Sequence, residues 1–438
     1  MKKRVIILGA GGRDFFNFLV CFKENPLYEV VCFTAAQIPG IEKRKFPREL
    51  AGRLYKNDIP IFPEEELPEL IRKYKIDEVI LSYSDLSHQE VMERASIVLA
   101  NGANFRLLGP KDTMLKSNKF IISVCAVRTG AGKSQTSRAI GEILKKHDKK
   151  VVAIRHPMPY SSDLRKQIIE RFVNYHDLEK YETTIEEKEE YEPWIKRGIP
   201  VYAGVDYEKI LRLAEKEADI IVYDAGNNDF SFIKPDIQIV IADPHRPGHE
   251  LTYYPGFVNF LMADIIIINK IDSAPKENIQ IIENNIKRYN TKANIIKAKS
   301  DLIIENPELI KGKKCIAIGD GPTLSHGGMN FSASTLAVNR FGGIIVDPKP
   351  YAVGSIKGIY KKYPHLKNEL PAMGYSRKQL KELEETINKA KCDLVVNGSP
   401  ADLKKILKVN KPIINIGYEL GKEAVKELEL LLKKYKFI

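Results

Sequence analysis

Residues 127–134 read Val-Arg-Thr-Gly-Ala-Gly-Lys-Ser and carry the clearest chemical signal in the 438-residue sequence. They follow an apolar segment that we expect to be a buried strand, and they precede a predicted helix from about Ser134. The backbone N–H groups of such a turn, with the helix N-terminus, bind phosphate oxygens. Lys133 would bridge the phosphates, and Ser134 would hold Mg²⁺. The predicted nucleotide-binding residues are Thr129, Gly130, Ala131, Gly132, Lys133, Ser134 and Gln135.

The loop departs from the usual P-loop pattern at its first position, where Val127 stands in place of glycine. The next residue, Arg128, occupies the position at which deviant P-loops carry a signature lysine. We expect Lys133 and Arg128 to stabilise charge on the transferring phosphoryl group. Arg128 would act either within one chain or across a homodimer.

Acidic and basic groups suited to the same chemistry follow later strands. The strand predicted at residues 220–223 runs into Asp224, the place where P-loop proteins carry a carboxylate for Mg²⁺. Asp229 ends the next turn, and His326 lies in a glycine-rich loop at residues 319–329. We predict that one of these two residues orients the attacking oxygen as a base, and they are equal candidates.

The segment Asn269-Lys270-Ile271-Asp272 follows another predicted strand and matches the Asn-Lys-x-Asp pattern of GTPases. In that pattern the aspartate accepts hydrogen bonds from guanine and the lysine packs over the base. We therefore add Asn269, Lys270 and Asp272 to the predicted nucleotide-binding residues, with Mg²⁺ and either ATP or GTP as cofactors.

Several histidines and arginines lie in loops that follow predicted strands, which is the ligand-binding side of a parallel sheet. Arginine suits bidentate recognition of phosphate. The predicted residues for binding an anionic substrate are Arg155, His156, His245, Arg246 and His249. An alternative is that His245 and His249 bind a metal, although Pro244 and Pro247 exclude a helical spacing between them.

The N-terminal segment Gly9-Ala10-Gly11-Gly12-Arg13-Asp14 follows a first strand in the manner of a dinucleotide-binding turn. Asp14 stands at the third glycine position, beside the place where a pyrophosphate would sit. We therefore expect a Rossmann-like domain that docks on its neighbour or binds another ligand, and not a dinucleotide.

Short apolar segments alternate with amphipathic ones along nearly the whole chain, which predicts an α/β protein with parallel sheets. We expect a Rossmann-like domain at residues 1–118 and a parallel-sheet P-loop NTPase domain at residues 119–345. A C-terminal α/β region would follow at residues 346–438.

The whole pattern resembles a known family of P-loop proteins. Arg-His-Pro-Met-Pro at 155–159, Asp-Ala-Gly-Asn-Asn-Asp at 224–229, Asp-Pro-His-Arg-Pro-Gly-His at 243–249, Asp-Gly-Pro-Thr at 320–323 and the Gly-Gly-Arg-Asp-Phe start are similar to the predicted GTPases called cyclic 2,3-diphosphoglycerate synthetases. The resemblance covers nearly the whole chain and implies a deviant, SIMIBI-like P-loop fold. It also implies phosphoryl transfer from a nucleoside triphosphate to 2,3-diphosphoglycerate, followed by ring closure with loss of phosphate.

Composition and charge limit the partners and the location that we expect for the protein. The formal charge is +12, and much of the excess lies as lysine in residues 346–438, so we expect a small phosphorylated metabolite as partner and no nucleic acid. No apolar run approaches the length of a membrane span, and five cysteines without a CxxC pair favour the cytoplasm. Lys-, Glu- and Ile-rich usage points to a thermophile. A GTPase switch or metallochaperone-type GTPase acting on a protein is the alternative function.

Overall fold

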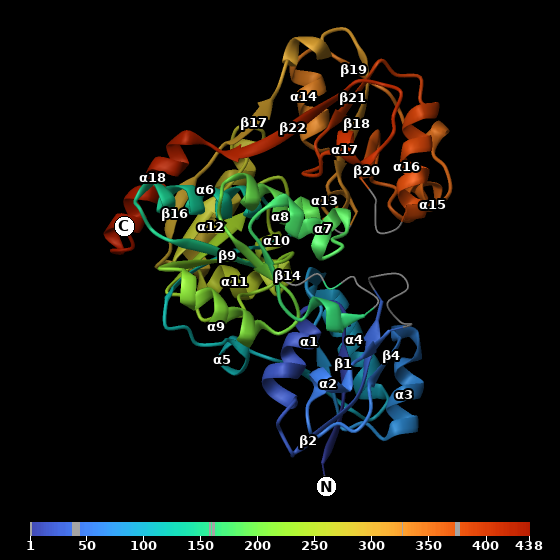
Figure 1. Cartoon of the computed structure of the whole chain (residues 1–438), viewed down its shortest axis with the longest axis vertical. Helices are drawn as coiled ribbons and strands as arrows, with labels where there is room; N and C mark the ends of the chain where they lie inside the picture. Colours follow the sequence, from blue (N-terminus) through green and yellow to red (C-terminus); the bar gives the residue numbers. More distant parts are fainter. Residues whose placement is uncertain (1, 37–43, 157–158, 160–162, 326, 373–376) are drawn as a thin grey trace.

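The computed structural model describes residues 2–36, 44–156, 159, 163–325, 327–372 and 377–438. Three α/β units, each built on its own sheet with parallel strands, follow one another along the long axis (Figure 1). We call them the N-terminal domain (residues 2–113), the P-loop domain (residues 114–299 with 421–438) and the third domain (residues 300–420). The mixed α/β architecture with parallel sheets confirms the predicted fold class at this level.

The N-terminal domain has a six-stranded sheet in the order β3-β4-β2-β1-β5-β7. All neighbours pair in parallel except β3 and β4. The central strand β1 is apolar and fully buried along Val5–Leu8 because helices cover both faces of the sheet. The elements are β1 Lys3–Leu8, α1 Arg13–Asn17, a π-helix Phe18–Phe22, β2 Tyr28–Ala35, β3 Lys45–Phe46, α2 Arg48–Ala51, β4 Ile59–Pro63, a 3₁₀ turn Glu64–Glu66, α3 Leu67–Tyr74, β5 Glu78–Leu81, β6 Leu86–Ser87, α4 His88–Ala100, β7 Asn104–Leu107 and α5 Pro110–Thr113.

The P-loop domain has an eight-stranded sheet in the order β10-β11-β9-β12-β8-β13-β15-β16. Only β10 is antiparallel to its neighbour. Helices α6, α8 and α18 cover one face, and α9, α11 and α12 cover the other. The elements are β8 Phe120–Ala126, α6 Lys133–Lys146, β9 Val151–Arg155, a 3₁₀ turn Leu164–Gln167, β10 Glu170–Phe172, α7 Tyr175–Lys180, α8 Ile185–Lys196, β11 Val201–Ala203, α9 Tyr207–Glu217, β12 Ile220–Asp224, β13 Ile237–Ala242, α10 His249–Thr252, β14 Tyr253–Tyr254, α11 Gly256–Met262, β15 Ile265–Ile268, α12 Lys276–Tyr289 and β16 Asn294–Lys297.

The third domain is built on a six-stranded sheet in which β17, β22, β21, β18 and β19 follow in order and β20 also pairs with β18. Its elements are β17 Ser300–Ile304, a 3₁₀ turn Pro307–Ile310, β18 Lys314–Asp320, α13 Gly321–Leu324, α14 Ala333–Arg340, β19 Ile344–Ile345, a 3₁₀ turn Lys349–Tyr351, α15 Ser355–Lys362, β20 Glu369–Ala372, α16 Arg377–Lys389, β21 Leu394–Asn397, α17 Leu403–Ile406 and β22 Ile413–Leu420.

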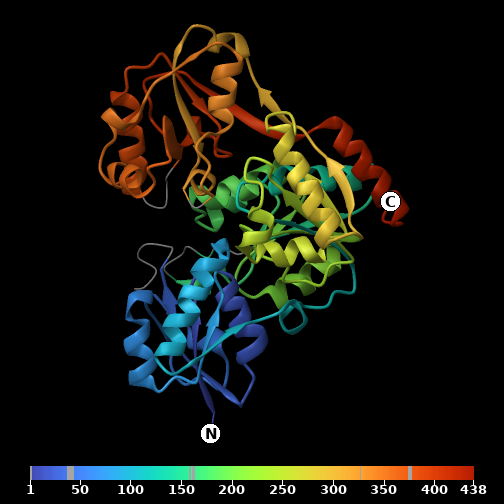
Figure 2. The ribbon, with the colours of Figure 1, turned by 180° about the vertical axis from the view of Figure 1, so that it is seen from behind.

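The predicted boundary between residues 345 and 346 falls inside this third sheet, between β19 and β20. The β18 strand, placed in the P-loop domain by the sequence analysis, is a central strand here. After β22 the chain returns, and the last helix, α18 Lys422–Lys434, packs on α6 of the P-loop domain (Figure 2). The error has a simple cause, since alternating β and α segments do not reveal which strands share a sheet.

The N-terminal domain docks on the P-loop domain through backbone and aromatic contacts. Strand β6 pairs antiparallel with β14. The ring of Phe16 stacks on Phe232 with centroids 3.9 Å apart and planes 6° apart, so an α1 side chain belongs to the core of the P-loop domain. Among the described residues, no helix is long and apolar enough to cross a membrane.

Candidate functional site

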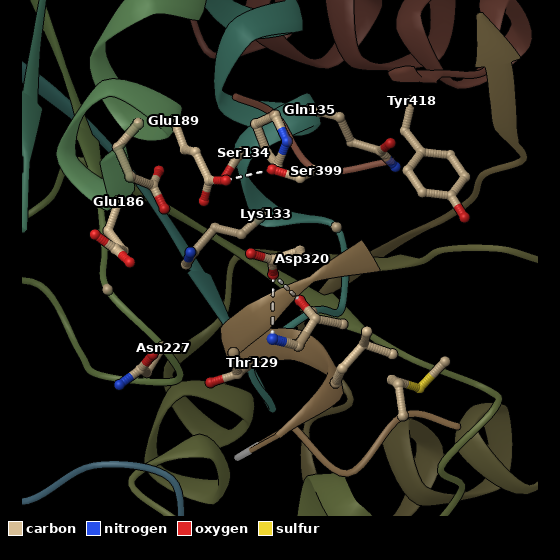
Figure 3. A pocket seen from close by; sticks show the side chains of 18 of the residues that line it. Thr129, Lys133, Ser134, Gln135, Glu186, Glu189, Asn227, Asp320, Ser399 and Tyr418 are labelled. Atoms are coloured by element: carbon tan, nitrogen blue, oxygen red, sulfur yellow. Dashed lines mark hydrogen bonds between the residues drawn. The ribbon is translucent and has the colours of Figure 1, made fainter. Parts of the chain in front are cut away.

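A cavity of about 690 Å³ opens where the three domains meet (Figure 3). Its floor is the P-loop between β8 and α6, its upper wall belongs to α8 and the third domain, and its far end reaches the N-terminal domain. The predicted nucleotide-binding residues that line it are Thr129, Gly130, Gly132, Lys133, Ser134, Gln135, Lys270 and Asp272.

The P-loop owes its shape to its glycines. Gly130 and Gly132 have φ of 77° and 112°, which is backbone that favours glycine. A Cβ on Gly132 would lie 2.0 Å from the side-chain nitrogen of Asn269. That nitrogen donates to the carbonyl of Ala131 at 2.9 Å, and Lys270 Nζ donates to the Gly130 carbonyl at 2.7 Å. The predicted Asn-Lys-x-Asp segment therefore fixes the P-loop backbone, while Asp272 lines the cavity.

Lys133 is the first residue of α6 and points into the cavity (Figure 3). Its side chain is 9% exposed and makes no hydrogen bond or salt bridge with any described residue. Burial, together with the nearby positive charge of Arg155, lowers the pKa of Lys133. A buried ammonium group without a partner is costly, so this position is suited to an anion supplied by a ligand.

The two residues predicted to hold Mg²⁺ are arranged compatibly with that role. Asp224 ends β12 beside β8, and it is fully buried. Its Oδ1 accepts from Ser137 Oγ at 2.9 Å, whereas its Oδ2 has no hydrogen bond among the described residues. Ser134 lines the cavity. A hydroxyl and an unsatisfied carboxylate oxygen are donors of the kind that Mg²⁺ accepts.

The third domain reaches the P-loop through the loop after β18. Asp320 caps the short helix α13 and accepts from the backbone nitrogen of Thr323 at 3.1 Å. A Cβ on Gly130 would lie 2.5 Å from Thr323 Cγ2, so the third domain touches the phosphate-binding turn.

Carboxyl groups dominate the upper wall of the cavity. Glu186, Glu189 and Glu190 come from α8, and Asp320 faces them from the third domain. Glu190 pairs with Arg155 at 2.7 Å, which holds the pKa of Glu190 below its usual range. Glu189 accepts a hydrogen bond from Ser399 of the third domain. Burial and the negative charge of Asp320 raise the pKa of Glu189 well above its usual range.

Comparison with known proteins shows the family to which this chain belongs. It is 58% identical over 435 residues to arginine synthetase ArcE of Thermococcus kodakarensis, a match that covers 99% of this chain and 97% of the relative. The chain belongs to the ArcE family. A second relative, cyclic 2,3-diphosphoglycerate synthetase of Thermococcus sibiricus, is 27% identical over 229 residues, covering 51% of this chain and 48% of that protein. No family model matches.

Among solved structures, LpxK of Aquifex aeolicus in complex with ATP aligns with this member of the ArcE family over 84% of the chain and 99% of LpxK. The identity is 12% and the TM-score is 0.43. The predicted family is thus confirmed in part, because a cyclic 2,3-diphosphoglycerate synthetase is a relative, but the much more similar relative is ArcE.

Arg128 lies outside the main cavity in this ArcE family member, contrary to its predicted place beside the phosphates. Its Nε donates to Asp85 Oδ1 of the N-terminal domain at 2.7 Å, and its guanidinium lies 3.6 Å from the ring centroid of Tyr253. Its Nη1 lies 2.6 Å from His249 Nδ1. Arg128 therefore joins the P-loop domain to the N-terminal domain, and its guanidinium group is already paired.

The predicted anion-binding arginines are also engaged elsewhere. Arg155 contacts Glu190 and the carbonyls of Asp224 and Ala225, and it is 3% exposed. Arg246 lies outside the cavity lining and pairs with Asp243 at 2.7 Å. Arg155 nevertheless lines the cavity, and both guanidinium groups are paired with carboxylates that the residue types alone do not reveal.

The predicted histidines have diverse positions. His156 and His245 line the cavity, and His249 does not. His245 Nε2 lies 2.9 Å from Ser273 Oγ, and burial lowers the pKa of His245. Burial and the charge of Arg128 lower the pKa of His249 to about 4. Among the described residues no group of three or more His, Cys, Asp or Glu is placed to hold a metal ion, which gives no support to a His245–His249 metal site.

Of the two candidate bases, His326 lies outside the described residues. Asp229 lines the cavity, but it is 1% exposed and pairs with Arg13 of the N-terminal domain at 2.6 Å and with His156 at 3.1 Å. These partners hold the pKa of Asp229 below its usual range. A carboxylate so engaged is a weak proton acceptor, and it serves to dock the N-terminal domain.

The N-terminal turn provides its own anion. Asp14 accepts hydrogen bonds from the backbone nitrogens of Gly11 at 2.9 Å, Gly12 at 3.1 Å and Phe15 at 2.8 Å. Its carboxylate thus occupies the nest of N–H groups that a pyrophosphate would need. This geometry agrees with the expectation that the turn binds no dinucleotide.

Sequence reasoning missed Arg138, Glu186 and Glu189, which also line the cavity. Arg138 follows Ser134 by one helical turn on α6, and it makes no hydrogen bond or salt bridge with any described residue. Burial and the charge of Arg197 lower the pKa of Arg138 to about 10. Its spacing from Ser134 was the available signal, because residues i and i+4 of a helix share a face.

Proposed function

We propose that the protein is a nucleoside-triphosphate-dependent synthetase that forms arginine. The observation that carries the proposal is the unpaired Lys133 at the floor of a cavity beneath an open phosphate-binding turn. The 58% identity to an arginine synthetase over nearly the whole chain supports arginine as the product. We also propose that it is a deviant, SIMIBI-like P-loop protein of the cytoplasm.

The chemistry of arginine indicates what the nucleotide would do. Citrulline differs from arginine by one oxygen in place of a guanidino nitrogen, and that oxygen is a poor leaving group. Transfer of the γ-phosphoryl group to the ureido oxygen leaves the nucleoside diphosphate and makes that oxygen a phosphate ester. Attack of ammonia on the ureido carbon then forms the C–N bond and expels inorganic phosphate.

Different residues of the cavity would bind the nucleotide and stabilise the charge that develops during transfer. The amides from Thr129 to Ser134 would hold the phosphates of ATP or GTP, and Lys133 would stabilise charge on the transferred group. Ser134 and Asp224 would hold Mg²⁺, which supplies charge neutralisation at the phosphates when bound. Arg138 is unpaired and lines the same cavity, and we assign it to an oxyanion of the substrates.

Cyclisation of 2,3-diphosphoglycerate is the second candidate, favoured by the 27% identity to a synthetase of that name. That substrate is strongly anionic, whereas the upper wall of the cavity carries several carboxyl groups and the predicted arginines are paired. We therefore rank it below arginine formation. A GTPase switch would instead hydrolyse nucleotide without any acceptor.

One experiment separates these functions. The pure protein is incubated with Mg²⁺, ATP or GTP, and either citrulline with ¹⁵N-ammonium or 2,3-diphosphoglycerate. We expect arginine with one ¹⁵N in its guanidino group, in a 1:1 ratio to phosphate. With ¹⁸O in the ureido group, the label should appear in inorganic phosphate by ³¹P NMR. Appearance of a cyclic product, or hydrolysis unaffected by citrulline and ammonium, would refute arginine formation.

A further inference from the structure

The acidic wall of the cavity has more carboxyl groups than the protein itself neutralises. Of the α8 residues, Glu190 is paired with Arg155. Glu189 is 8% exposed and interacts with a neutral hydroxyl, that of Ser399. Asp320 hydrogen-bonds to Thr323 and forms no salt bridge with a described residue. Buried Glu189 and half-buried Asp320 therefore both face the cavity without a salt bridge to a described residue.

The two carboxyl groups come from different domains and influence each other. Glu189 belongs to the P-loop domain and Asp320 to the third domain, and both lie near Lys133 in Figure 3. Burial and, after it, the negative charge of Asp320 raise the pKa of Glu189. The charge of Lys133 favours the ionised form of Asp320, but the proposed nucleotide would engage this ammonium group with its phosphate oxygens. A cation between Glu189 and Asp320 would remove the repulsion.

Independent observations show that the adjoining space is built for a ligand. Lys133 is more than nine-tenths buried, points into the cavity and lacks a partner among the described residues. The hydroxyl of Thr129 is also buried against the cavity and has no hydrogen-bond partner there. These groups would meet phosphate oxygens, so a phosphorylated intermediate would lie directly beside the two carboxyl groups.

We propose that Glu189 and Asp320 form a binding site for the cationic N–H group of the reaction, either free ammonium or the guanidinium of arginine. Both cations donate several hydrogen bonds to carboxylate oxygens. Water in this wall of the cavity would be a poor substitute for these charged donors. Since the carboxyl groups come from separate domains, the site would be complete only when the third domain contacts the P-loop. The inference rests on the proposed function for its choice of cation.

The test uses the isosteric variants Glu189→Gln and Asp320→Asn in the full chain. Glu192→Gln is the matched control, because Glu192 lies one turn further along α8, is equally buried and does not line the cavity. An amide keeps a hydrogen bond with Ser399 or Thr323, and near-equal thermal midpoints would show that the variants fold. Ammonium and guanidinium are distinguished by measuring the KM for ammonium and, separately, arginine binding by calorimetry.

We expect at least about a tenfold rise in the KM for ammonium, in the Kd for arginine, or in both, as hydrogen bonds to charged groups are lost. The nucleotide KM and the Glu192→Gln control should change less than about twofold. Wild-type values for both cations in both variants would overturn the proposal.

Methylguanidinium chloride and ammonium chloride, titrated calorimetrically without turnover, separate this inference from the proposed function. Saturable binding of either probe to the wild type, lost in Glu189→Gln and Asp320→Asn, would support the cation site even if no arginine is formed. Binding of neither probe would overturn it even if arginine is formed.

Discussion

Thr323 of the third domain lies against Gly130 of the P-loop, where a Cβ on the glycine would lie 2.5 Å from Thr323 Cγ2. The phosphate-binding turn is therefore covered by a residue that belongs to another domain. Asp320, which accepts a hydrogen bond from Thr323, brings its carboxyl group into the same cavity. We therefore expect nucleotide binding at this turn to depend on the position of the third domain.

Gly130→Ala should lower kcat/KM at least about tenfold, or about 1.4 kcal/mol, because the new methyl group collides with Thr323 in a backbone region that disfavours alanine. Gly342→Ala is the matched control, since Gly342 has φ of 73° against 77° for Gly130 but no atom within 4 Å of its Cβ position. Steady-state kinetics and thermal midpoints of both variants measure the difference. Equal activity losses in the two would show that backbone strain, and not the contact, is responsible.

Lys133→Ala should abolish nucleotide turnover and leave the fold intact. The thermal midpoint should stay the same or rise, because the substitution removes a buried charge that lacks a partner among the described residues. Lys146→Ala, on the exposed end of the same helix, should keep wild-type turnover. Turnover by Lys133→Ala would contradict the P-loop assignment.

Asp85→Asn should weaken docking of the N-terminal domain. Asp85 and Arg128 are 5% and 4% exposed, and loss of one partner from a buried pair costs about 3–5 kcal/mol. Asparagine tolerates the φ of 61° at this position, so the backbone conformation is retained. Denaturant unfolding and a double-mutant cycle with Arg128→Gln measure the coupling. Glu24→Gln, at an exposed pair with Arg53, should cost less than about 1 kcal/mol.

Stability should depend on pH through Glu170. Burial and the nearby charge of Glu187 raise the pKa of Glu170 from 4.5 to about 8. The folded state thus holds this proton more tightly than the unfolded state, so the contribution of Glu170 to stability falls as the pH rises from about 4.5 to about 8. Glu170→Gln has no proton to lose here, so its stability should not fall with this ionisation. The gain in thermal midpoint over the wild type should therefore be larger at pH 8 than at pH 5. Thermal midpoints at both pH values check the sign, with exposed Glu208→Gln showing no such trend.

Local patterns predicted a large part of the fold. The strand β15 is a continuous apolar segment because helices cover both faces of its sheet, and such segments are visible in any sequence. The boundary at 345/346 failed because strand pairing is a property of distant segments. Arg128 and Asp85, for example, are 43 residues apart in the chain yet form one buried ion pair.

The sequence by itself determined the phosphate-binding turn and its lysine, because the chemistry of that turn depends on consecutive residues and on a backbone that only glycine at Gly130 and Gly132 readily adopts. Only the tertiary structure decided which charges are free. Arg128, Arg155 and Arg246 are paired with carboxyl groups, whereas Arg138, Glu189 and Asp320 face the cavity without an opposite charge bound to them among the described residues. A charge is neutralised by what lies near it in space, and the order of residues does not specify that distance.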